Sequence, residues 1–520
     1  MGSGAYGTLW ALPRPPRPSH APRVRKLLAV VAVTLAVLLP WHGLAQQEGA
    51  PAVSGQPPPP EPPADTQAPE KPGDAGDGEP APPAKVKDTL RVSILTFSPG
   101  DHPFYKFGHN AILIYDDTKR GRPQYAKVYN YGTFSFGDPA LIPKFFLGRF
   151  MYWLSAQTLQ GTITGYKREG RAITEQVLDL DPATEIELQR LLEENLLPDN
   201  KYYKYDYYRD NCSTRVRDMI DKVTGGRVKE AASGPGRLTY REHTLRLTES
   251  LPAEYVILHL VMGDLIDKPT TEWDEDFIPM ELQKTLRKVT IVGEDGAERP
   301  IVKEEKVILP SQQVPPPENP PVTWPYSLVT GLAFGGVFAA LGRRAARNGR
   351  LARVGLGAAL SFFGFLWGFF GLFFTAAWIF TDHAVGYGNE NTLLCVPWAI
   401  VLTGTGINVA RGKAKSIHRA FVLVRAAVIS ALLALVLKVL PWFDQDNGFF
   451  LVFFIPFWAG AFVGLRFLDQ ATPEVKEPPT KAPAKEKESE APPPKKKVEA
   501  KKLEAKKPEA KRADDDAPDA

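Results

Sequence analysis

Five apolar segments in the C-terminal half constrain this chain more than any other feature. They cover residues 324–341, 354–380, 393–410, 420–443 and 449–467. A helix needs about 20 apolar residues to cross the hydrocarbon core of a bilayer, and each segment approaches that length. Because backbone polar groups inside lipid must bond to one another, residues 324–468 are predicted to form an all-α membrane domain of about five transmembrane helices.

The charges between these segments predict the orientation of the membrane domain. Arginine and lysine follow the first, third and fifth segments, whereas the loops at residues 382–391 and 444–447 contain neither. Basic loops stay on the cytoplasmic side of a membrane. The tail of residues 469–520, rich in Lys, Pro and Glu, is therefore expected to be cytoplasmic and disordered. An odd number of spans then puts the sequence before residue 324 outside the cytoplasm.

The first 45 residues have the pattern of an export signal. Several arginines precede an apolar run at residues 27–39, and Gly43-Leu-Ala45 offers small residues to a signal peptidase. We predict a signal peptide at residues 1–45, with an uncleaved anchor as the alternative. Residues 46–87 contain repeated Pro-Pro pairs and almost no bulky apolar side chains, so they are expected to form a disordered linker.

Residues 88–292 have the pattern of a folded domain. Apolar alternation predicts strands at residues 90–96, 109–115, 125–131 and 171–180, the middle two joined as a hairpin. Helices are predicted at residues 182–195 and 211–223. This mixture predicts an α+β domain. A second proline-rich stretch makes residues 293–323 a predicted linker to the membrane domain.

The exported part of the chain contains a single cysteine, Cys212. The other cysteine, Cys395, lies in an apolar segment, so Cys212 has no partner for an intrachain disulfide. Cys212 follows Asp210 and Asn211, which favour a helix N-cap, and the helix dipole is expected to favour its thiolate. His109 begins a predicted strand, from which its ring can face that helix as a base. The plainer alternative is a buried filler cysteine and a turn histidine.

Two further groups could complete such a site. Asn130 lies at the end of the strand that pairs with the one His109 begins, so its amide could orient the imidazole; alternatively, it caps the following turn. Several tyrosines precede the cysteine, and a hydroxyl there, or the N–H groups of the helix start, could stabilise an oxyanion. Tyr205 and Tyr208 are the candidates for substrate contact, although clustered tyrosines more often pack.

The predicted outer loop between the second and third segments carries polar residues that include His383 and Asn389. This loop is expected on the same side of the membrane as the cysteine. His383 and Asn389 are therefore candidates for substrate contact, with ordinary polar residues at span ends as the alternative.

Composition argues against several other functions. The net charge is only +4 and the basic residues form no stripe with aromatic residues, so nucleic acid is not an expected partner. The arginines beside the cysteine, Arg209, Arg215 and Arg217, are expected to pair with Asp206 and Asp218, with contact to lipid phosphate as the alternative. Histidines lack metal-ligand spacing, and neither a glycine-rich phosphate loop nor a Gly-x-Ser-x-Gly motif occurs. We therefore expect no metal and no cofactor.

The order of the histidine and the cysteine resembles known enzymes. A strand-start His followed by an Asn-Cys pair at a helix start resembles the circularly permuted papain-like enzymes, which include NlpC-like peptidases and the lecithin–retinol acyltransferase group. A closer resemblance is to the Lnb-type lipoprotein N-acyltransferase family, with its Lnb N-terminal periplasmic domain. The motifs that carry it are Pro99-Gly-Asp101, Phe107-Gly-His109, Val128-Tyr-Asn-Tyr-Gly132, Tyr205-Asp-Tyr-Tyr-Arg-Asp-Asn-Cys212, Phe277-Ile-Pro279, Thr381-Asp-His383 and Asn389-Glu-Asn391.

The resemblance implies a permuted papain-like fold that transfers a fatty acyl chain. The chain would pass from a phospholipid donor, through a thioester on Cys212, to the N-terminal amine of a diacylglyceryl lipoprotein, with His109 and Asn130 as the other catalytic residues. It implies a multi-pass protein of the bacterial inner membrane with its catalytic domain in the periplasm. Two alternatives stay open: a periplasmic cysteine hydrolase that acts on peptide, amide or phospholipid, and a non-catalytic membrane scaffold.

Overall fold

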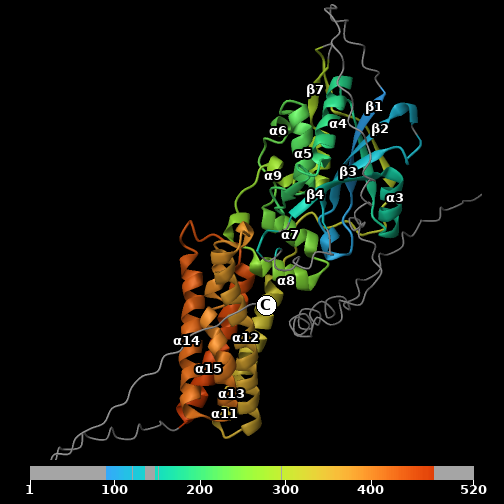
Figure 1. Ribbon diagram of the computed structural model, residues 1–520. Coiled ribbons are helices and arrows are strands. Elements are labelled where there is room, and N and C mark those ends of the chain that lie inside the picture. Colours follow the sequence, from blue (N-terminus) through green and yellow to red (C-terminus); the bar gives the residue numbers. More distant parts are fainter. Residues whose placement is uncertain are drawn as a thin grey trace, which may run out of the picture. The chain divides into compact units, whose positions relative to one another are not determined.

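The computed structural model describes residues 89–119, 121–134, 144, 147–149, 151–293 and 296–472. The predicted signal peptide, the predicted linker at residues 46–87 and most of the predicted tail lie outside the described residues. Within them, an α+β domain is followed by a helical membrane domain (Figure 1). The expected fold class is therefore confirmed, with the papain-like detail left as a prediction.

A seven-stranded sheet forms the centre of the α+β domain. Its order is β6-β4-β3-β2-β1-β5-β9, and all neighbours pair antiparallel. The strands are β1 (Leu90–Phe97), β2 (His109–Asp116), β3 (Lys127–Thr133), β4 (Met151–Thr158), β5 (Ile173–Leu178), β6 (Tyr202–Lys204) and β9 (Val302–Leu309). A separate two-stranded ribbon contains β7 (Thr290–Val292) and β8 (Glu298–Pro300).

The register of the central hairpin determines which side chains share a face. Strands β2 and β3 pair as Ile112 with Tyr129 and Leu113 with Val128, which confirms the predicted hairpin. Continued by one pair, this register puts Asn130 opposite Ala111. Residues directly opposite, and those two apart on one strand, share a face. Asn130 is therefore on the same face of the sheet as His109.

Helices cover both faces of the sheet. They are α3 (Leu159–Arg168), α4 (Pro182–Leu196), α5 (Cys212–Val223), α6 (Arg227–Ala231), α7 (Tyr240–Thr248), α8 (Pro252–Val261), α9 (Glu272–Glu275) and α10 (Pro279–Leu286). Helices α4 and α5 pack on one face, where Ile112, Leu188 and Val216 share a buried cluster. Helix α3 covers the other face, where Tyr166 packs with Leu113 (Figure 1).

The α+β domain extends further along the chain than the sequence suggested. Strand β9 lies inside residues 293–323, which were predicted as a linker, and it pairs with β5 at the edge of the sheet. Charged residues occupy most of its middle, so its apolar alternation is weak. The edge position explains this composition, because only one side of an edge strand is paired and its side chains face solvent.

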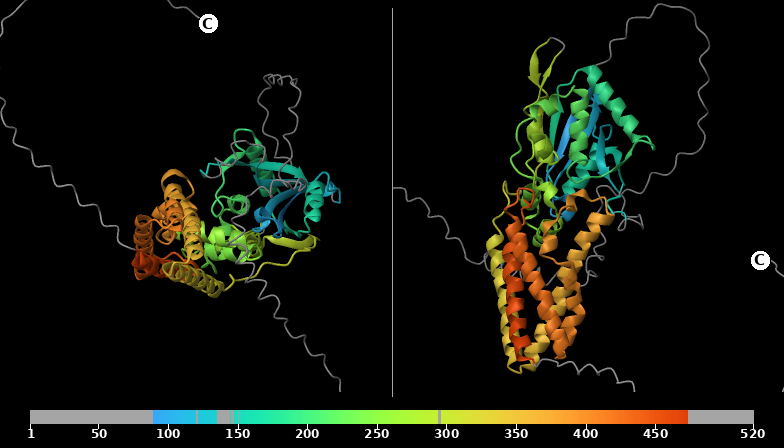
Figure 2. Two further views of the ribbon diagram at one scale, coloured as in Figure 1. Left: turned by 90° about the horizontal axis from the view of Figure 1, so that it is seen from below. Right: turned by 90° about the vertical axis from the view of Figure 1, so that its left-hand side faces the viewer.

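Four helices of the membrane domain, among the described residues, are long and apolar enough to cross a bilayer. They are α11 (Trp324–Ala346), α12 (Arg350–Phe380), α14 (Ala414–Leu437) and α15 (Gly448–Ala471), and they run side by side (Figure 1, Figure 2). The third predicted segment is shorter than expected: it forms the 3-10 turn η7 (Pro397–Ile400) and then α13 (Val401–Ala410). Pro397 has no N–H and disfavours helical conformation before it, so the helix cannot start earlier.

Glycines allow the membrane helices to approach closely. A Cβ added at Gly371 of α12 would lie 1.8 Å from the carbonyl oxygen of Cys395, and one at Gly364 would lie 2.5 Å from the Cβ of Leu402 in α13. Likewise, a Cβ at Gly342 of α11 would lie 2.1 Å from the carbonyl oxygen of Gly464 in α15. Membrane helices gain packing contacts through such small residues, because lipid supplies no hydrophobic drive between them.

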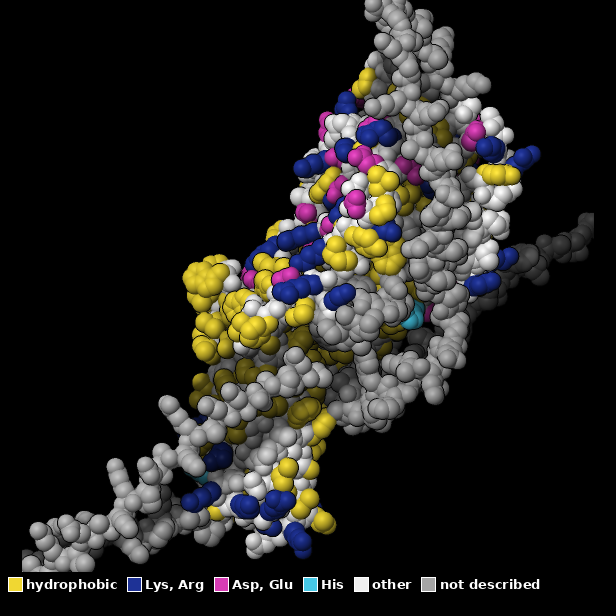
Figure 3. Space-filling model, in the orientation of Figure 1, with side chains coloured by type: hydrophobic (Ala, Val, Ile, Leu, Met, Phe, Trp, Pro, Cys, Tyr) yellow, Lys and Arg dark blue, Asp and Glu magenta, His cyan; other side chains and the backbone are white. Residues whose placement is uncertain are grey.

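The two ends of the helices differ in residue type. Exposed Lys and Arg side chains gather at one end, which includes the Arg343 and Arg344 turn of α11, and hydrophobic side chains cover much of the helix surface (Figure 3). The opposite ends carry the exposed tryptophans Trp324, Trp378 and Trp442. Tryptophan favours the level of the lipid head groups. This end, to which the α+β domain is joined, therefore has the character of a membrane–water interface.

Hydrogen bonds join the α+β domain to the loops at this end. The backbone N–H of Gly263 donates to the carbonyl of Val385 (2.8 Å), and the Gln445 side chain donates to the carbonyl of Met262 (2.9 Å). The Tyr255 and Thr323 hydroxyl groups lie 2.9 Å apart. The residues after α8 thus connect the two parts of the described chain.

Candidate active site

The cysteine site begins with a well-formed helix cap. Asn211 caps α5: its side chain accepts the N–H groups of Ser213 and Thr214, and the Thr214 hydroxyl accepts the N–H of Asn211. The Asn211 amide also donates to the carbonyl of Phe277 (2.9 Å). Cys212 is therefore the first residue of the helix, as predicted, and its backbone is held from both sides.

The Cys212 thiol is buried, with 8% of the residue exposed. Backbone N–H groups of Asn110, Ser213 and Cys212 itself lie near the sulfur and favour its charged form. Burial nevertheless raises the pKa of the thiol to about 11, because these donors and the Arg171 guanidinium offset only part of the desolvation. The start of the helix favours the thiolate, as expected, but burial outweighs this effect and favours the neutral thiol.

His109 and Asn130 form a pair at the start of β2. The His109 Nε2 lies 3.3 Å from the Asn130 Oδ1, while the Asn130 amide donates to the carbonyl of Val128 (3.3 Å). The bond to the Val128 carbonyl orients the Asn130 amide so that its oxygen faces the His109 ring. An amide oxygen only accepts hydrogen bonds, so the His109 Nε2 carries the hydrogen. The Nδ1 atom then keeps its lone pair. The structure therefore brings Asn130 to the position that was predicted from the hairpin.

The imidazole of His109 is held neutral. Its ring stacks on Phe97, with 5.5 Å between the ring centroids. Burial, and secondly the positive charge of Arg171, lower the pKa of His109 to about 4, although the bond to Asn130 acts in the opposite direction. A neutral imidazole can accept a proton near pH 7, as a general base must.

The cysteine and the histidine are connected through their neighbours at the start of β2. Asn110, the residue that follows His109 in the strand, lies near the sulfur. The Asn110 side chain strengthens this junction, because its oxygen accepts the Ser213 hydroxyl (2.8 Å) and its amide donates to the Thr96 hydroxyl (3.0 Å). Among the described residues, no hydrogen bond joins the sulfur directly to the His109 ring.

Two tyrosines from the segment before α5 lie near the thiol. A Cβ added at Gly132 would be 3.5 Å from the Cys212 Cβ, 3.6 Å from the Tyr205 ring and 3.9 Å from the Tyr203 hydroxyl, so these groups surround one point. Gly132 has φ +89° in the β3 bulge, a conformation that a side chain would strain. Tyr205 stacks on Tyr152 with centroids 4.1 Å apart. Tyr205 thus lies close to the cysteine, and its contact with substrate stays a prediction.

The Tyr203 hydroxyl is buried and has no hydrogen-bond partner in the described residues. The Arg215 guanidinium lies 4.2 Å from its ring centroid, and Arg215 in turn pairs with Asp210. Burial, followed by the negative charge that Cys212 can carry, raises the pKa of Tyr203 well above its usual range. The Tyr203 hydroxyl therefore keeps its proton near neutral pH, and it can donate a hydrogen bond near the thiol.

The other predicted contact residues lie elsewhere. Tyr208 directs its hydroxyl to Thr244 (2.9 Å) and to the Met262 sulfur (3.2 Å), away from the thiol. Asn389 is buried and donates to the carbonyl of Leu260 (2.9 Å). His383 is half-buried in the loop after α12, next to Asp382, which pairs with Lys204 (3.2 Å).

Sequence reasoning missed two groups of this site. The sequence does not distinguish Tyr203 from the neighbouring tyrosines. Its only distinguishing feature is that it alternates with Tyr205 along the edge of the sheet. For Arg171 the sequence predicts only that a strand begins there. Arg171 is 1% exposed, its guanidinium packs on the rings of Tyr105 and Tyr166, and its Nη2 atom has no partner in the described residues. No local pattern distinguishes such an arginine from a surface one.

A metal site is not evident in the described part of the chain. Within those residues, no group of three or more His, Cys, Asp or Glu side chains lies together in a way that could hold an ion. The site itself offers a thiol, an imidazole and hydrogen-bond donors.

Fold and site together define a membrane protein whose α+β domain carries a cysteine beside a histidine–asparagine pair. Residues 86–246 match the family described as the Lnb N-terminal periplasmic domain, so the chain contains a domain of this family. The match includes His109, Asn130 and Cys212 and ends before the membrane helices. No curated protein and no solved structure matches the chain.

Proposed function

We propose that this protein is a cysteine-dependent acyltransferase. It would move a fatty acyl chain from a phospholipid, through a thioester on Cys212, to the N-terminal amine of lipoproteins. The observation that carries the proposal is the arrangement at the start of β2. Asn110, which follows His109, accepts the hydroxyl of Ser213, which follows Cys212, and the Asn130 oxygen lies 3.3 Å from the His109 Nε2. A nucleophile, a base and a group that orients the base are the parts that covalent acyl transfer needs.

In the first half-reaction, the Nδ1 atom of His109 accepts the thiol proton as the sulfur attacks the ester carbonyl of the phospholipid. The tetrahedral intermediate then loses the lysophospholipid alkoxide, which takes the proton from His109. The products are a Cys212 thioester and a lysophospholipid. Because the resting thiol is neutral, proton transfer and attack are coupled, and no preformed thiolate is needed.

The negative oxygen of the tetrahedral intermediate needs hydrogen-bond donors. The unpartnered Tyr203 hydroxyl is one candidate, and the N–H groups at the start of α5 are others. Donors that are positioned before the reaction stabilise charge where it develops, without reorganisation. The hydroxyl of Tyr203 would thus gain its first partner in the transition state.

In the second half-reaction, the uncharged α-amine of a diacylglyceryl lipoprotein attacks the thioester. His109 accepts a proton from the attacking nitrogen and returns one to the departing sulfur. The products are the N-acylated lipoprotein and the free thiol. Both substrates are anchored in the bilayer, so fusion of the domain to membrane helices raises their effective concentration. We infer an inner-membrane protein with a cytoplasmic tail from the positive-inside pattern.

The test is intact-mass analysis of the purified full-length protein mixed with phospholipid. An acyl adduct that hydroxylamine removes is expected on the wild type. Cys212→Ser is the variant that should lack it, and Cys395→Ser, which changes the buried cysteine of the membrane domain, is the matched control that should retain it. A second step adds a synthetic diacylglyceryl-cysteine peptide, which should gain the acyl chain.

Two other outcomes of this experiment would favour the hydrolase and the scaffold, respectively. Release of free fatty acid without an amine acceptor would indicate a hydrolase. A wild-type protein that forms no adduct, and whose Cys212→Ser variant behaves as the wild type in cells, would indicate a scaffold and end the proposal.

A further inference from the structure

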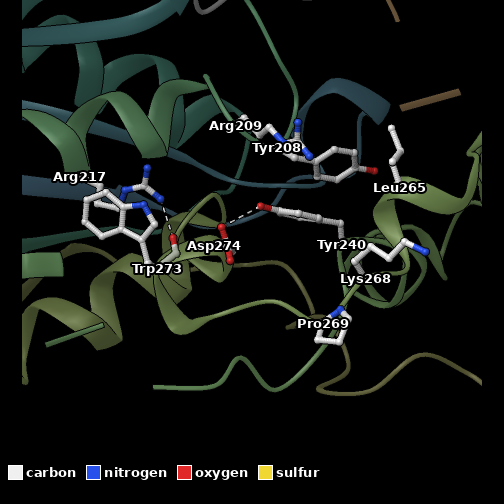
Figure 4. Close-up of a pocket in the computed structure, with 9 residues that line it drawn as sticks. All are labelled: Tyr208, Arg209, Arg217, Tyr240, Leu265, Lys268, Pro269, Trp273 and Asp274. Carbon is white, nitrogen blue, oxygen red and sulfur yellow. Dashed lines mark hydrogen bonds between the residues drawn. The ribbon is translucent and has the colours of Figure 1, made fainter. Parts of the chain in front are cut away.

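A cavity of about 380 Å³ lies in the α+β domain apart from the thiol. Its lining residues come from the segment before α5, from α5 itself, from α7 and from residues 265–274 (Figure 4). They are Tyr208, Arg209, Arg217, Tyr240, Leu265, Lys268, Pro269, Trp273 and Asp274. Neither Cys212 nor His109 is among them. We call this hollow the Arg209 cavity.

The charges around the Arg209 cavity are unbalanced, with three cationic side chains and one carboxylate. Arg217 pairs with Asp218 as predicted, and its guanidinium lies 3.6 Å from the Trp273 ring centroid. Lys268 pairs with Asp444 at 2.7 Å. Arg209 does not pair with Asp206 as expected: within the described residues, its side chain has no ion pair or hydrogen bond. One guanidinium thus remains open for a ligand.

Figure 4 shows that polar groups on the cavity wall are already arranged. The Asp274 carboxylate accepts a hydrogen bond from the Tyr240 hydroxyl (3.3 Å), and the Trp273 carbonyl accepts one from Arg217 (2.5 Å). These bonds hold the carboxylate and one arginine against the wall. Arg209 and Lys268 lie on other parts of the lining, and the unpaired Arg209 guanidinium is the cation that an anion inside the cavity would meet.

The Arg209 cavity lies at the level of the interface with the membrane domain. Lys268 bonds Asp444, two residues after the exposed Trp442. A smaller hollow shares Tyr208, Arg209, Tyr240 and Leu265 with the cavity and reaches Ala384 and Val385 in the loop after α12. Since tryptophans favour the head-group level of a bilayer, lipid head groups are the molecules expected beside this opening.

We propose that the Arg209 cavity binds the phosphate-bearing head group of an anionic phospholipid. Arginine and lysine are the side chains that bind phosphate, arginine through two parallel hydrogen bonds. The cavity is at the small end of the range for ligand sites, about 300–1,000 Å³, so it suits a head group whose acyl chains stay in the bilayer. The Trp273 face is already occupied by Arg217, which disfavours a stacked sugar.

The head-group site is a binding site in its own right, beyond the proposed acyl transfer. Arg217 is five residues after Cys212 in the same helix, which rotates the two side chains to nearly opposite sides of it. A lipid held in the cavity would therefore secure the domain on the bilayer, or present lipid to it, without contact with the sulfur. Binding can be measured on protein that cannot form a thioester.

The test uses the full-length Cys212→Ser protein in an uncharged detergent, with isothermal titration of soluble short-chain phospholipids. Dihexanoyl-phosphatidylglycerol is the anionic probe, dihexanoyl-phosphatidylcholine the zwitterionic one, and inorganic phosphate the third. Arg209→Gln should weaken binding of the anionic lipid about tenfold or more, the typical effect of losing a charge-assisted hydrogen bond. Arg209→Glu should remove binding.

The matched control is Arg122→Gln, which removes the same charge from an exposed turn between β2 and β3. Its affinity should stay within about twofold, since an exposed charge at a distance is screened. Equal effects of Arg209→Gln and Arg122→Gln would overturn the proposal. So would equal affinity for the two lipids, or for inorganic phosphate. The two proposals can fail separately. If the wild type forms the acyl adduct but the Cys212→Ser protein does not bind the anionic lipid selectively, the head-group site is refuted and the proposed acyl transfer stands.

Discussion

Two groups of buried polar residues behave differently in the structure. Around Cys212, polar groups are buried but incompletely bonded: the Tyr203 hydroxyl and one Arg171 nitrogen have no partners in the described residues. In the loop after α12, the Asn389 amide is used to hold Leu260, and Asn391 donates to the same carbonyl (3.1 Å). Both groups carry polar side chains into buried positions.

The difference between them lies in what their hydrogen bonds achieve. Burying an unbonded polar group costs about 1–3 kcal/mol, so such groups are rare unless they serve a purpose. The free Tyr203 hydroxyl near the sulfur is therefore a candidate donor for the proposed chemistry. The bonds of Asn389 are made within the chain and connect two parts of it.

The largest effect on the rate of acyl-adduct formation is expected from a change at His109. His109→Ala should slow formation of the acyl adduct about 1,000-fold, because general base catalysis contributes about 10²–10⁴-fold. The rate of adduct growth by mass analysis provides the measurement. His102→Ala, which changes an exposed histidine of the same domain, should leave the rate unchanged. A small effect of His109→Ala would remove the histidine from the mechanism.

Tyr203→Phe should slow adduct formation about 100-fold, the usual loss for one oxyanion donor. The half-saturating lipid concentration should change little, because the hydroxyl gains its partner only in the transition state. Tyr202→Phe, on the exposed face of the same strand, is the control. If both variants react at the wild-type rate, the free hydroxyl has another explanation and the contrast weakens.

The pH dependence distinguishes a neutral pair from an ion pair. Because the pKa of His109 is lowered to about 4, the ring accepts a proton from solvent only below that pH, and the base form is present above it. Adduct formation should therefore be constant from about pH 5 to about pH 9 and fall about tenfold per pH unit below about pH 4. A bell-shaped profile centred near neutral pH would instead indicate a thiolate–imidazolium pair.

The smallest effect is expected at Asn389, which bonds the loop after α12 to the carbonyl of Leu260. Asn389→Ala should lower the free energy of unfolding by about 1–2 kcal/mol, because a buried hydrogen bond is lost, while adduct formation stays at the wild-type rate well below the melting temperature. Asn408→Ala, whose amide bonds only Gly404 of its own helix, is the control for thermal unfolding. A slower reaction with unchanged stability would restore Asn389 as a substrate contact.

Local sequence was sufficient for elements whose cause is local. The Asn211 cap and the apolar face of the following run define α5 regardless of what packs on it. The turn between two apolar-alternating runs defines the β2–β3 hairpin, and with it the position of Asn130 beside His109. Strand β9 was missed because pairing with β5, rather than its own charged residues, makes it a strand.

Sequence alone also determined the chemical parts of this protein: one exported thiol, a histidine, an asparagine and membrane-length apolar segments. Tertiary structure decided their states. The thiol is neutral because desolvation exceeds the effect of the helix start, Tyr203 differs from Tyr205 because one hydroxyl lacks a partner, and Arg209 differs from Arg215 because only one finds an aspartate. Each depends on burial and partners that distant segments supply, which neighbouring residues in the chain do not encode.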